Sequence, residues 1–121
     1  FFYCTMAKNL LIKAGVDPGR YQFKIIQSGY EALDFLKTNS QVKLVLTDLV
    51  LKDLSGYELL QQYQEQVSRH RSQHNTPSFV LMTATDSSNE LDIYRTKGFK
   101  EVFQKPLDVK SIHEFIKGEL E

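Results

Sequence analysis

The sequence predicts an α/β fold, a doubly wound parallel sheet with helices on both faces. Helical and extended patterns alternate along the chain, which is typical of parallel strands joined by right-handed crossovers. The strand expected at residues 42–48 shows little alternation of apolar and polar residues, as expected when both faces of a strand are covered. Capping boxes of the form Ser-x-x-Glu open three of the helices, at Ser28, Ser55 and Ser87.

The N-terminal half is predicted to begin with a helix over residues 2–14, because apolar residues recur there at helical spacing and Gly15 would end it. A short strand at residues 21–26, the helix that opens at Ser28 and the strand at residues 42–48 follow. The inward-facing residues expected in the two helices are Phe2, Met6, Leu10, Ala32, Leu33 and Leu36.

The C-terminal half continues the alternation. The helix that opens at Ser55 precedes a strand at residues 78–82, and the helix that opens at Ser87 precedes a strand at residues 101–104. A last helix starts near Asp108. The inward-facing residues expected in these helices are Leu59, Leu60, Tyr63, Val67, Leu91, Tyr94, Val109, Ile112, Phe115, Ile116 and Leu120.

Composition is that of one globular domain, residues 1–121, with a 41% hydrophobic content that suits a single core. Fifteen basic residues balance fifteen acidic ones, so attraction to nucleic acid or to an anionic membrane is not indicated. No apolar run approaches the roughly 18 residues of a membrane span. The single Cys4 excludes an intramolecular disulfide and suits a reducing, cytoplasmic setting.

Polar side chains stand at the ends of three consecutive strands. In doubly wound sheets ligands bind outside the carboxyl ends of the strands, and there the sequence places Asp48, Thr83 and Lys105. Each has a structural interpretation of its own, as a strand-ending carboxylate, a β-forming threonine or a surface lysine. Together they place a carboxylate, a hydroxyl and an ammonium in one crevice.

This combination suits phosphoryl transfer to a carboxylate. An Asp48 oxygen would attack in line, while the Lys105 ammonium and the Thr83 hydroxyl each take an oxygen of the transferred group. A hard divalent cation, Mg²⁺, would take another oxygen and needs oxygen ligands of its own. Because a lone carboxylate holds Mg²⁺ poorly, further acidic groups are expected close by.

Three segments at mutually consistent spacings carry a resemblance to a known family. "LVLTDLVLKDLSGYELL", "FVLMTAT" and "VFQKPL" resemble the receiver domains of two-component response regulators and hybrid histidine kinases, over the whole chain. The resemblance implies a flavodoxin-like (CheY-like) sheet of strand order 2-1-3-4-5. It also implies that Asp48 is the phosphoacceptor, Thr83 the switch hydroxyl and Lys105 the lysine that contacts the phosphoryl group.

Further site residues follow from the same resemblance. Asp48 and the backbone carbonyl of Val50 would ligate Mg²⁺, and Val50 and Thr85 occupy the variable positions that tune reaction rates. The Lys105–Pro106 peptide is expected to be cis, and Gly56 matches the glycine that begins the following helix.

The start of the chain departs from the family pattern. Receivers open with a central strand that ends in an acidic pair, whereas here a helix is predicted from the first residues. This favours an N-terminally truncated domain that lacks strand 1, with the acidic pair upstream of Phe1. The alternative makes residues 1–4 a shortened first strand in which Cys4 and Thr5 replace the acids, giving a pseudo-receiver without a metal site.

Smaller departures concern the switch. Leu51 and Lys52 replace the frequent Met-Pro pair, so the loop is less rigid and carries a positive charge. Val102 stands where the family has an aromatic switch residue, and Phe103 should point to the opposite face, which puts aromatic coupling in doubt. An apolar Val50 cannot orient an attacking water, which predicts a long-lived phospho-aspartate.

The resemblance implies a signalling domain that is not an enzyme. The donor would be a phosphohistidine on a histidine kinase or a histidine phosphotransfer domain, and phosphorylation would alter the face formed by the last two helices and the strand between them. Output would pass to a fused or separate domain, or through self-association by the last two helices, without direct contact with nucleic acid or membrane.

Two rival functions are considered. A pseudo-receiver would serve as a docking module with Asp48 left unphosphorylated. An aspartate-nucleophile phosphatase of the haloacid dehalogenase type also uses Asp, Ser/Thr and Lys at strand ends. It needs a second Asp two residues after the nucleophile, however, where this chain has Val50.

Overall fold

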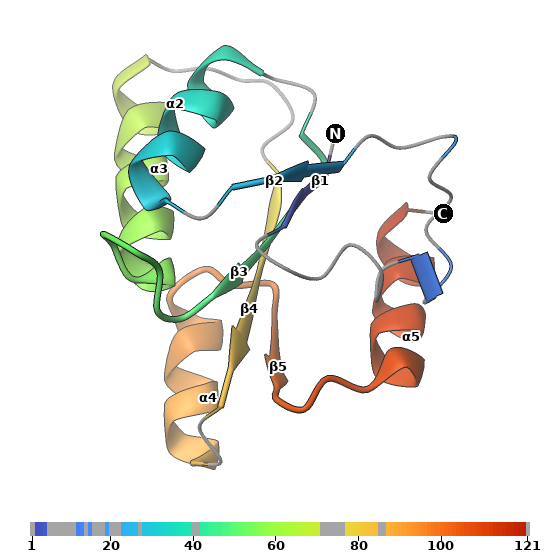
Figure 1. Cartoon of the computed structure of the whole chain (residues 1–121). Coiled ribbons are helices and arrows are strands. Elements are labelled where there is room, and N and C mark those ends of the chain that lie inside the picture. The colour runs from blue at the N-terminus through green and yellow to red at the C-terminus, as the bar shows by residue number, and fades with distance from the viewer. Residues whose placement is uncertain are drawn as a thin grey trace.

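The fold of the chain is a five-stranded parallel sheet with helices on its two faces (Figure 1). The structure, a computed structural model, describes residues 2–4, 12–13, 15, 19, 23–26, 28–39, 42–70, 77–84 and 87–120. The strands are β1 (Phe2–Cys4), β2 (Phe23–Ile25), β3 (Leu44–Asp48), β4 (Ser78–Thr83) and β5 (Glu101–Gln104). The helices with given bounds are α2 (Gly29–Thr38), α3 (Gly56–His70), α4 (Ser88–Thr96) and α5 (Val109–Leu120).

The strand order is β2-β1-β3-β4-β5, which confirms the predicted doubly wound sheet. All neighbouring strands are parallel, and the register sets Asp48 beside Met82 and Thr83 beside Gln104. The carboxyl ends of β3, β4 and β5 therefore meet at one edge of the sheet.

The central strand β1 corrects the prediction that strand 1 is missing. Phe2–Cys4 pairs with β2 on one side and with β3 on the other, so these residues fill the middle of the sheet rather than opening a helix. A short apolar run fits a strand and a helix equally well by periodicity. Here the backbone pairing with β2 and with β3 makes the run a strand. The alternative of a shortened first strand matches the structure.

Most of the first predicted helix lies outside the described residues. Ile12 and Lys13 are helical, and Gly15 has a φ of +108°, a left-handed conformation that suits a glycine ending a helix. The backbone N–H of Gly15 donates to the carbonyl of Ile12 at 3.1 Å.

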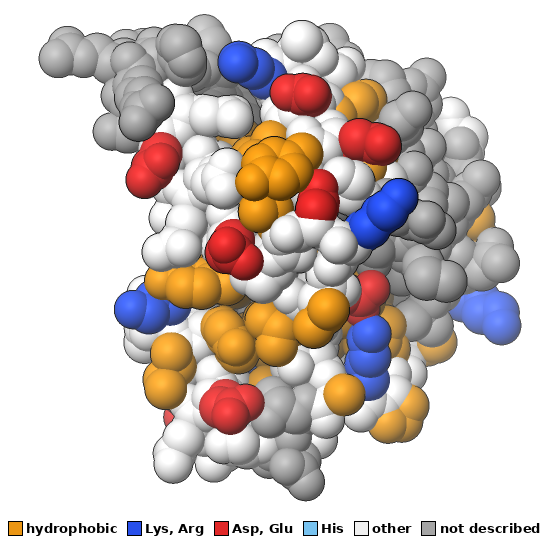
Figure 2. All heavy atoms as spheres, turned by 60° about the vertical axis from the view of Figure 1, so that its left-hand side comes forward, with side chains coloured by type: hydrophobic (Ala, Val, Ile, Leu, Met, Phe, Trp, Pro, Cys, Tyr) orange, Lys and Arg blue, Asp and Glu red, His pale blue; other side chains and the backbone are white. Residues whose placement is uncertain are grey.

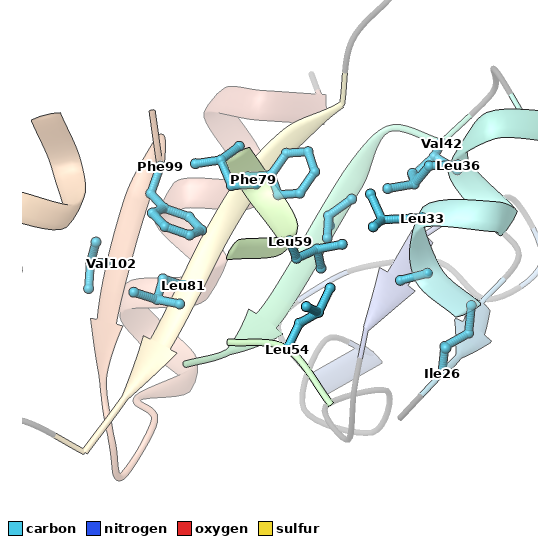
Figure 3. Packing of buried hydrophobic residues seen from close by; sticks show 13 residues of the cluster. Ile26, Leu33, Leu36, Val42, Leu54, Leu59, Phe79, Leu81, Phe99 and Val102 are labelled. Atoms are coloured by element: carbon cyan, nitrogen blue, oxygen red, sulfur yellow. The ribbon is translucent and has the colours of Figure 1, made fainter. Parts of the chain in front are cut away.

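The helices divide between the two faces of the sheet. Figure 1 shows α2, α3 and α4 on one side and α5 on the other. The core beneath α2, α3 and α4, part of which is drawn in Figure 3, includes Val45, Leu59, Leu81 and Val102. A second core packs α5 against the opposite face and consists of Leu44, Leu46, Val80, Met82, Ile112 and Ile116. Alternate residues of β3 and β4 thus enter opposite cores, as the pleat of a strand requires.

All three predicted serine caps form, and the capping box at Ser55 is complete. The backbone N–H of Glu31 donates to the Ser28 hydroxyl at 3.3 Å, and that of Glu90 donates to the Ser87 hydroxyl at 3.4 Å. The box at Ser55 is reciprocal, since the N–H of Glu58 donates to the Ser55 hydroxyl and the N–H of Ser55 to the Glu58 carboxylate. These local bonds explain why the starts of the helices were predictable.

Helix α4 is the most weakly buried of the helices. The predicted inward residues of α2 are buried, as are Ile112 and Ile116 of α5. Leu91 and Tyr94 of α4 are only partly buried, and no α4 residue is buried. Figure 2 shows the face built by α2, α3 and α4, on which apolar side chains lie among acidic ones. Exposed large apolar residues of the described helices are Tyr30 on α2 and Ile93 on α4. None of the described helices is long and apolar enough to span a membrane.

Candidate site at the carboxyl ends of the strands

Asp48 is the last residue of β3, after four buried positions. Thr47 before it is fully buried and its hydroxyl donates to the Asp48 carbonyl at 3.0 Å. The Asp48 side chain is 21% exposed, so its carboxylate lies at the surface end of an otherwise buried strand. The strand ends at Asp48, as the sequence predicts.

Lys105 meets that carboxylate directly. Its Nζ lies 2.5 Å from Oδ1 of Asp48, an oxygen shielded from solvent, while the lysine side chain itself is 45% exposed. The backbone N–H of Lys105 donates to the carbonyl of Thr83 at 2.8 Å, which fixes the start of the loop after β5. The Lys105–Pro106 peptide is cis, as the resemblance implies.

Thr83 completes the group from β4. It is the last residue of that strand, is 4% exposed and lies one position beyond Met82, the neighbour of Asp48. A carboxylate, an ammonium and a hydroxyl therefore share one edge of the sheet. Thr85, the second predicted rate-tuning residue, lies outside the described residues.

The loop after Asp48 turns back sharply onto its strand. Val50 forms an isolated antiparallel bridge with Ser55, and the backbone N–H of Gly56 donates to the carbonyl of Leu49 at 2.7 Å. A side chain at Gly56 would collide with the carbonyl oxygen of Asp48. The predicted family glycine is thus required by a close approach of two backbones.

Comparison with known proteins decides the family. A family profile described as "Response regulator receiver domain" matches residues 7–117, which is most of the chain. The chain belongs to the response regulator receiver domains. No curated protein matches it significantly.

Solved receiver structures share the fold at low sequence identity. One is the receiver domain of the response regulator Ssk1 from Saccharomyces cerevisiae, in a co-crystal with the histidine phosphotransfer protein Ypd1. It has a TM-score of 0.77 and 18% identity, covering 98% of this chain and 86% of that one. A response regulator from Chloroflexus aurantiacus has a TM-score of 0.75 and 20% identity, covering 98% and 95%. A CheY-like receiver from Methylobacillus flagellatus has a TM-score of 0.72 and 25% identity, covering 97% and 94%.

The described part of the receiver does not fit the Mg²⁺ that its family implies. Mg²⁺ requires near-octahedral oxygen coordination, usually from one or two carboxylates together with phosphate oxygens and waters. Among the described residues no group of three or more His, Cys, Asp or Glu side chains is placed to hold a metal ion. The first acidic residue of the sequence is Asp17, and β1 ends beside Leu46 at Cys4. The acidic pair is expected upstream of Phe1 only if strand 1 is missing, and β1 at Phe2–Cys4 removes that ground. The metal role of Val50 stays a prediction.

The residues that would couple the site to the surface differ from the family pattern as predicted. Val102 is 4% exposed beneath α4, whereas Phe103 packs edge-on against Phe115 on the α5 side, with 5.9 Å between ring centroids. At this place α4 and β5 are joined by Arg95, which contacts the Glu101 carboxylate at 3.1 Å and the Val102 carbonyl at 3.5 Å. The polar contact that Arg95 makes between α4 and β5 therefore lies next to Val102, which replaces the aromatic switch residue expected from the resemblance.

Asp53 is a feature of the site region that sequence reasoning missed. Its carboxylate accepts hydrogen bonds from the Ser28 hydroxyl at 2.6 Å, from the N–H of Gly29 at 2.7 Å and from the N–H of Tyr30 at 3.2 Å. These bonds, that from Ser28 foremost, lower the pKa of Asp53 to about 2. Its partners lie 23 to 25 positions away, so no local pattern indicates them.

A surface pocket of about 310 Å³ lies away from this site. Leu60, Tyr63, Phe79 and Gly98 are among its lining residues, and burial raises the pKa of Tyr63. Phe79 is near the amino end of β4, whereas Thr83 ends the strand. The pocket therefore takes no part in the chemistry at Asp48.

Proposed function

We propose that this receiver accepts a phosphoryl group on Asp48 from a phosphohistidine of a partner protein. In the transfer the P–N bond of the phosphohistidine breaks, its electron pair stays on the imidazole nitrogen, and a P–O bond forms to a carboxylate oxygen of Asp48. The ion pair between Lys105 Nζ and Asp48 Oδ1 at 2.5 Å carries this proposal.

Lys105 and Thr83 have separate tasks in the transfer. The ammonium of Lys105 orients the carboxylate, and then takes one oxygen of the bound phosphoryl group. The hydroxyl of Thr83, at the adjacent strand end, donates to another of these oxygens. The new group adds about −1.5 to −2 charges at one edge of the sheet, which reorganises the loops there.

The partner is a histidine phosphotransfer domain or a histidine kinase. The Ssk1 receiver, which shares this fold, is described in a complex with such a phosphotransfer protein, which supports this class of partner. The output face would be α4, β5 and α5, signalling to a fused or separate domain or by self-association. The single Cys4 is consistent with an intracellular setting.

Labelling with a small phosphodonor tests the proposal. The receiver is incubated with acetyl phosphate and Mg²⁺, and covalent adducts are counted by intact-protein mass spectrometry. One phosphoryl group per chain is expected, absent in Asp48→Asn and retained in Asp34→Asn, which changes an exposed carboxylate on α2. An adduct that persists in Asp48→Asn would refute the assignment of the phosphoacceptor.

A docking module without phosphorylation is the second candidate. It is favoured because no cluster of three or more His, Cys, Asp or Glu side chains is placed to hold a metal ion among the described residues. The same labelling experiment separates the two functions, since a docking module takes no phosphoryl group but still binds a histidine phosphotransfer domain in a pull-down with purified proteins.

A further inference from the structure

The loop over residues 49–55, which joins Asp48 to α3, is held by backbone hydrogen bonds at its ends. The N–H of Leu49 donates to the carbonyl of Met82 at 3.1 Å, and the N–H of Leu51 donates to the carbonyl of Leu54 at 3.1 Å. With the bridge between Val50 and Ser55, these bonds shape the loop and join it to β4. They do not reach α2.

The carboxylate of Asp53 supplies the connection to α2. It accepts from Ser28, Gly29 and Tyr30 at the first turn of that helix. It also accepts from the N–H of Leu54 in its own loop at 2.8 Å. One side chain thus satisfies donors of two elements, among them N–H groups at a helix start that have no partner within the helix.

Close packing reinforces the same connection. Leu54 is 6% exposed, and a Cβ built on Gly29 would lie 2.8 Å from the Cβ of Leu54. The backbone at the start of α2 therefore touches the loop directly, next to the Asp53 hydrogen bonds. A larger residue at position 29 would push the two elements apart.

We propose that Asp53 is a positioning residue that fixes the loop after Asp48 to the start of α2 and thereby sets the geometry of the phosphoacceptor. The proposal rests on the phosphoacceptor role of Asp48. It makes α2 part of the support of the site.

The expected effect follows from how strongly transfer depends on position. In-line attack needs the carboxylate held within a narrow range of distance and angle, and a misplacement of about 1 Å can cost roughly 10²-fold in rate. The Lys105 ion pair restrains one oxygen of Asp48, but the backbone that follows it is restrained through the loop. Releasing Asp53 from α2 should lower the rate of labelling by about tenfold.

The experiment compares Asp53→Ala, Asp53→Asn and Asp34→Asn with the wild-type receiver. Labelling by acetyl phosphate is followed over time, well below the unfolding temperature of each variant. Amide hydrogen exchange of residues 49–56 and of the start of α2 is measured on the unphosphorylated proteins. Asparagine keeps one acceptor oxygen, so Asp53→Asn should be intermediate. Asp34→Asn, a charge-matched change on α2 away from the Asp53 hydrogen bonds, should label like wild type.

Each outcome has a definite meaning. Slower labelling and faster exchange in the loop for Asp53→Ala, partly restored by asparagine, support a positioning role. A variant that unfolds at a lower temperature yet labels at the wild-type rate shows that Asp53 is only structural and overturns the proposal. If the wild-type receiver takes no label, the proposed function fails. Hydrogen exchange alone then tests whether Asp53 fixes the loop to the start of α2. Unchanged protection of the loop in Asp53→Ala would reject the connection as well.

Discussion

Val50 is an exposed apolar residue close to Asp48 in the chain. It follows Asp48 by two positions and is 80% exposed, yet its side chain offers no hydrogen-bonding group. Water therefore reaches the neighbourhood of Asp48 without a side chain at this position to orient it. Because hydrolysis of an acyl phosphate needs an in-line water, Val50 should favour a long-lived phosphorylated state.

Replacing Val50 by asparagine tests this directly. The amide can bind and orient a water, so dephosphorylation of Val50→Asn should be faster by roughly three- to tenfold, at most about 1.4 kcal/mol in activation free energy. The loss of adduct from purified phosphorylated protein is followed by mass spectrometry. Val50→Leu, which stays apolar, serves as the control and should decay like wild type. An unchanged or slower rate in Val50→Asn would mean that Val50 does not limit hydrolysis.

Single residues at strand ends were predictable because each follows a locally recognisable strand. Asp48, Thr83 and Lys105 come after apolar runs, and parallel strands bring their carboxyl ends together. Asp53 was not predictable, since its role depends on the start of a helix 23 to 25 positions earlier. Sequence patterns thus indicate residues whose neighbours are set by topology, and miss those whose partners depend on how a particular loop packs.

At the scale of elements, β1 carries the largest difference between sequence pattern and structure. Phe2–Cys4 lies between β2 and β3, with Tyr3 beside both Lys24 and Val45. Three residues give too short a run for periodicity to distinguish a strand from the first turn of a helix. The backbone groups of β2 and β3 need hydrogen-bonding partners, and this need, which arises only in the folded sheet, makes Phe2–Cys4 a strand.

A proline at position 3 distinguishes the two assignments. In a central strand Tyr3→Pro removes a ladder donor and leaves its carbonyl partner unpaired, so the free energy of unfolding should fall by about 1–3 kcal/mol. In the first turn of a helix proline would be tolerated. Urea unfolding followed by circular dichroism measures the difference, and Tyr3→Val, which keeps the N–H and a high strand propensity, is the control. A Tyr3→Pro protein as stable as Tyr3→Val would argue against β1 as a central strand.

The whole molecule is held together at several places by carboxylates that are hydrogen-bonded in the folded state. Besides Asp53, Asp108 at the start of α5 accepts from the Ser111 hydroxyl at 2.9 Å and from the N–H of Lys110. The hydrogen bond from Ser111 is the main cause that lowers the pKa of Asp108. Burial raises the pKa of Glu119, but hydrogen bonds from Ser78 and Lys100 outweigh it and leave that pKa lowered. These carboxylates connect α2 with the loop after β3, cap α5, and join α5 to the start of β4.

This arrangement predicts a loss of stability in acid. A carboxyl group whose folded pKa is depressed takes up a proton first in the unfolded chain, near its ordinary pKa of about 4, so the unfolded state binds more protons below that pH. Stability is therefore fully present above about pH 5 and falls as the pH drops toward 2, the folded pKa of Asp53. Urea midpoints measured from pH 7 to pH 2.5 should decrease over this window. Asp53→Asn and, to a smaller extent, Asp108→Asn should flatten the decrease, because each removes one group that couples protonation to unfolding. If Asp53→Asn gave a curve parallel to that of wild type, the Asp53 bonds would contribute nothing to the acid sensitivity of the fold, and their role would be confined to the geometry of the loop.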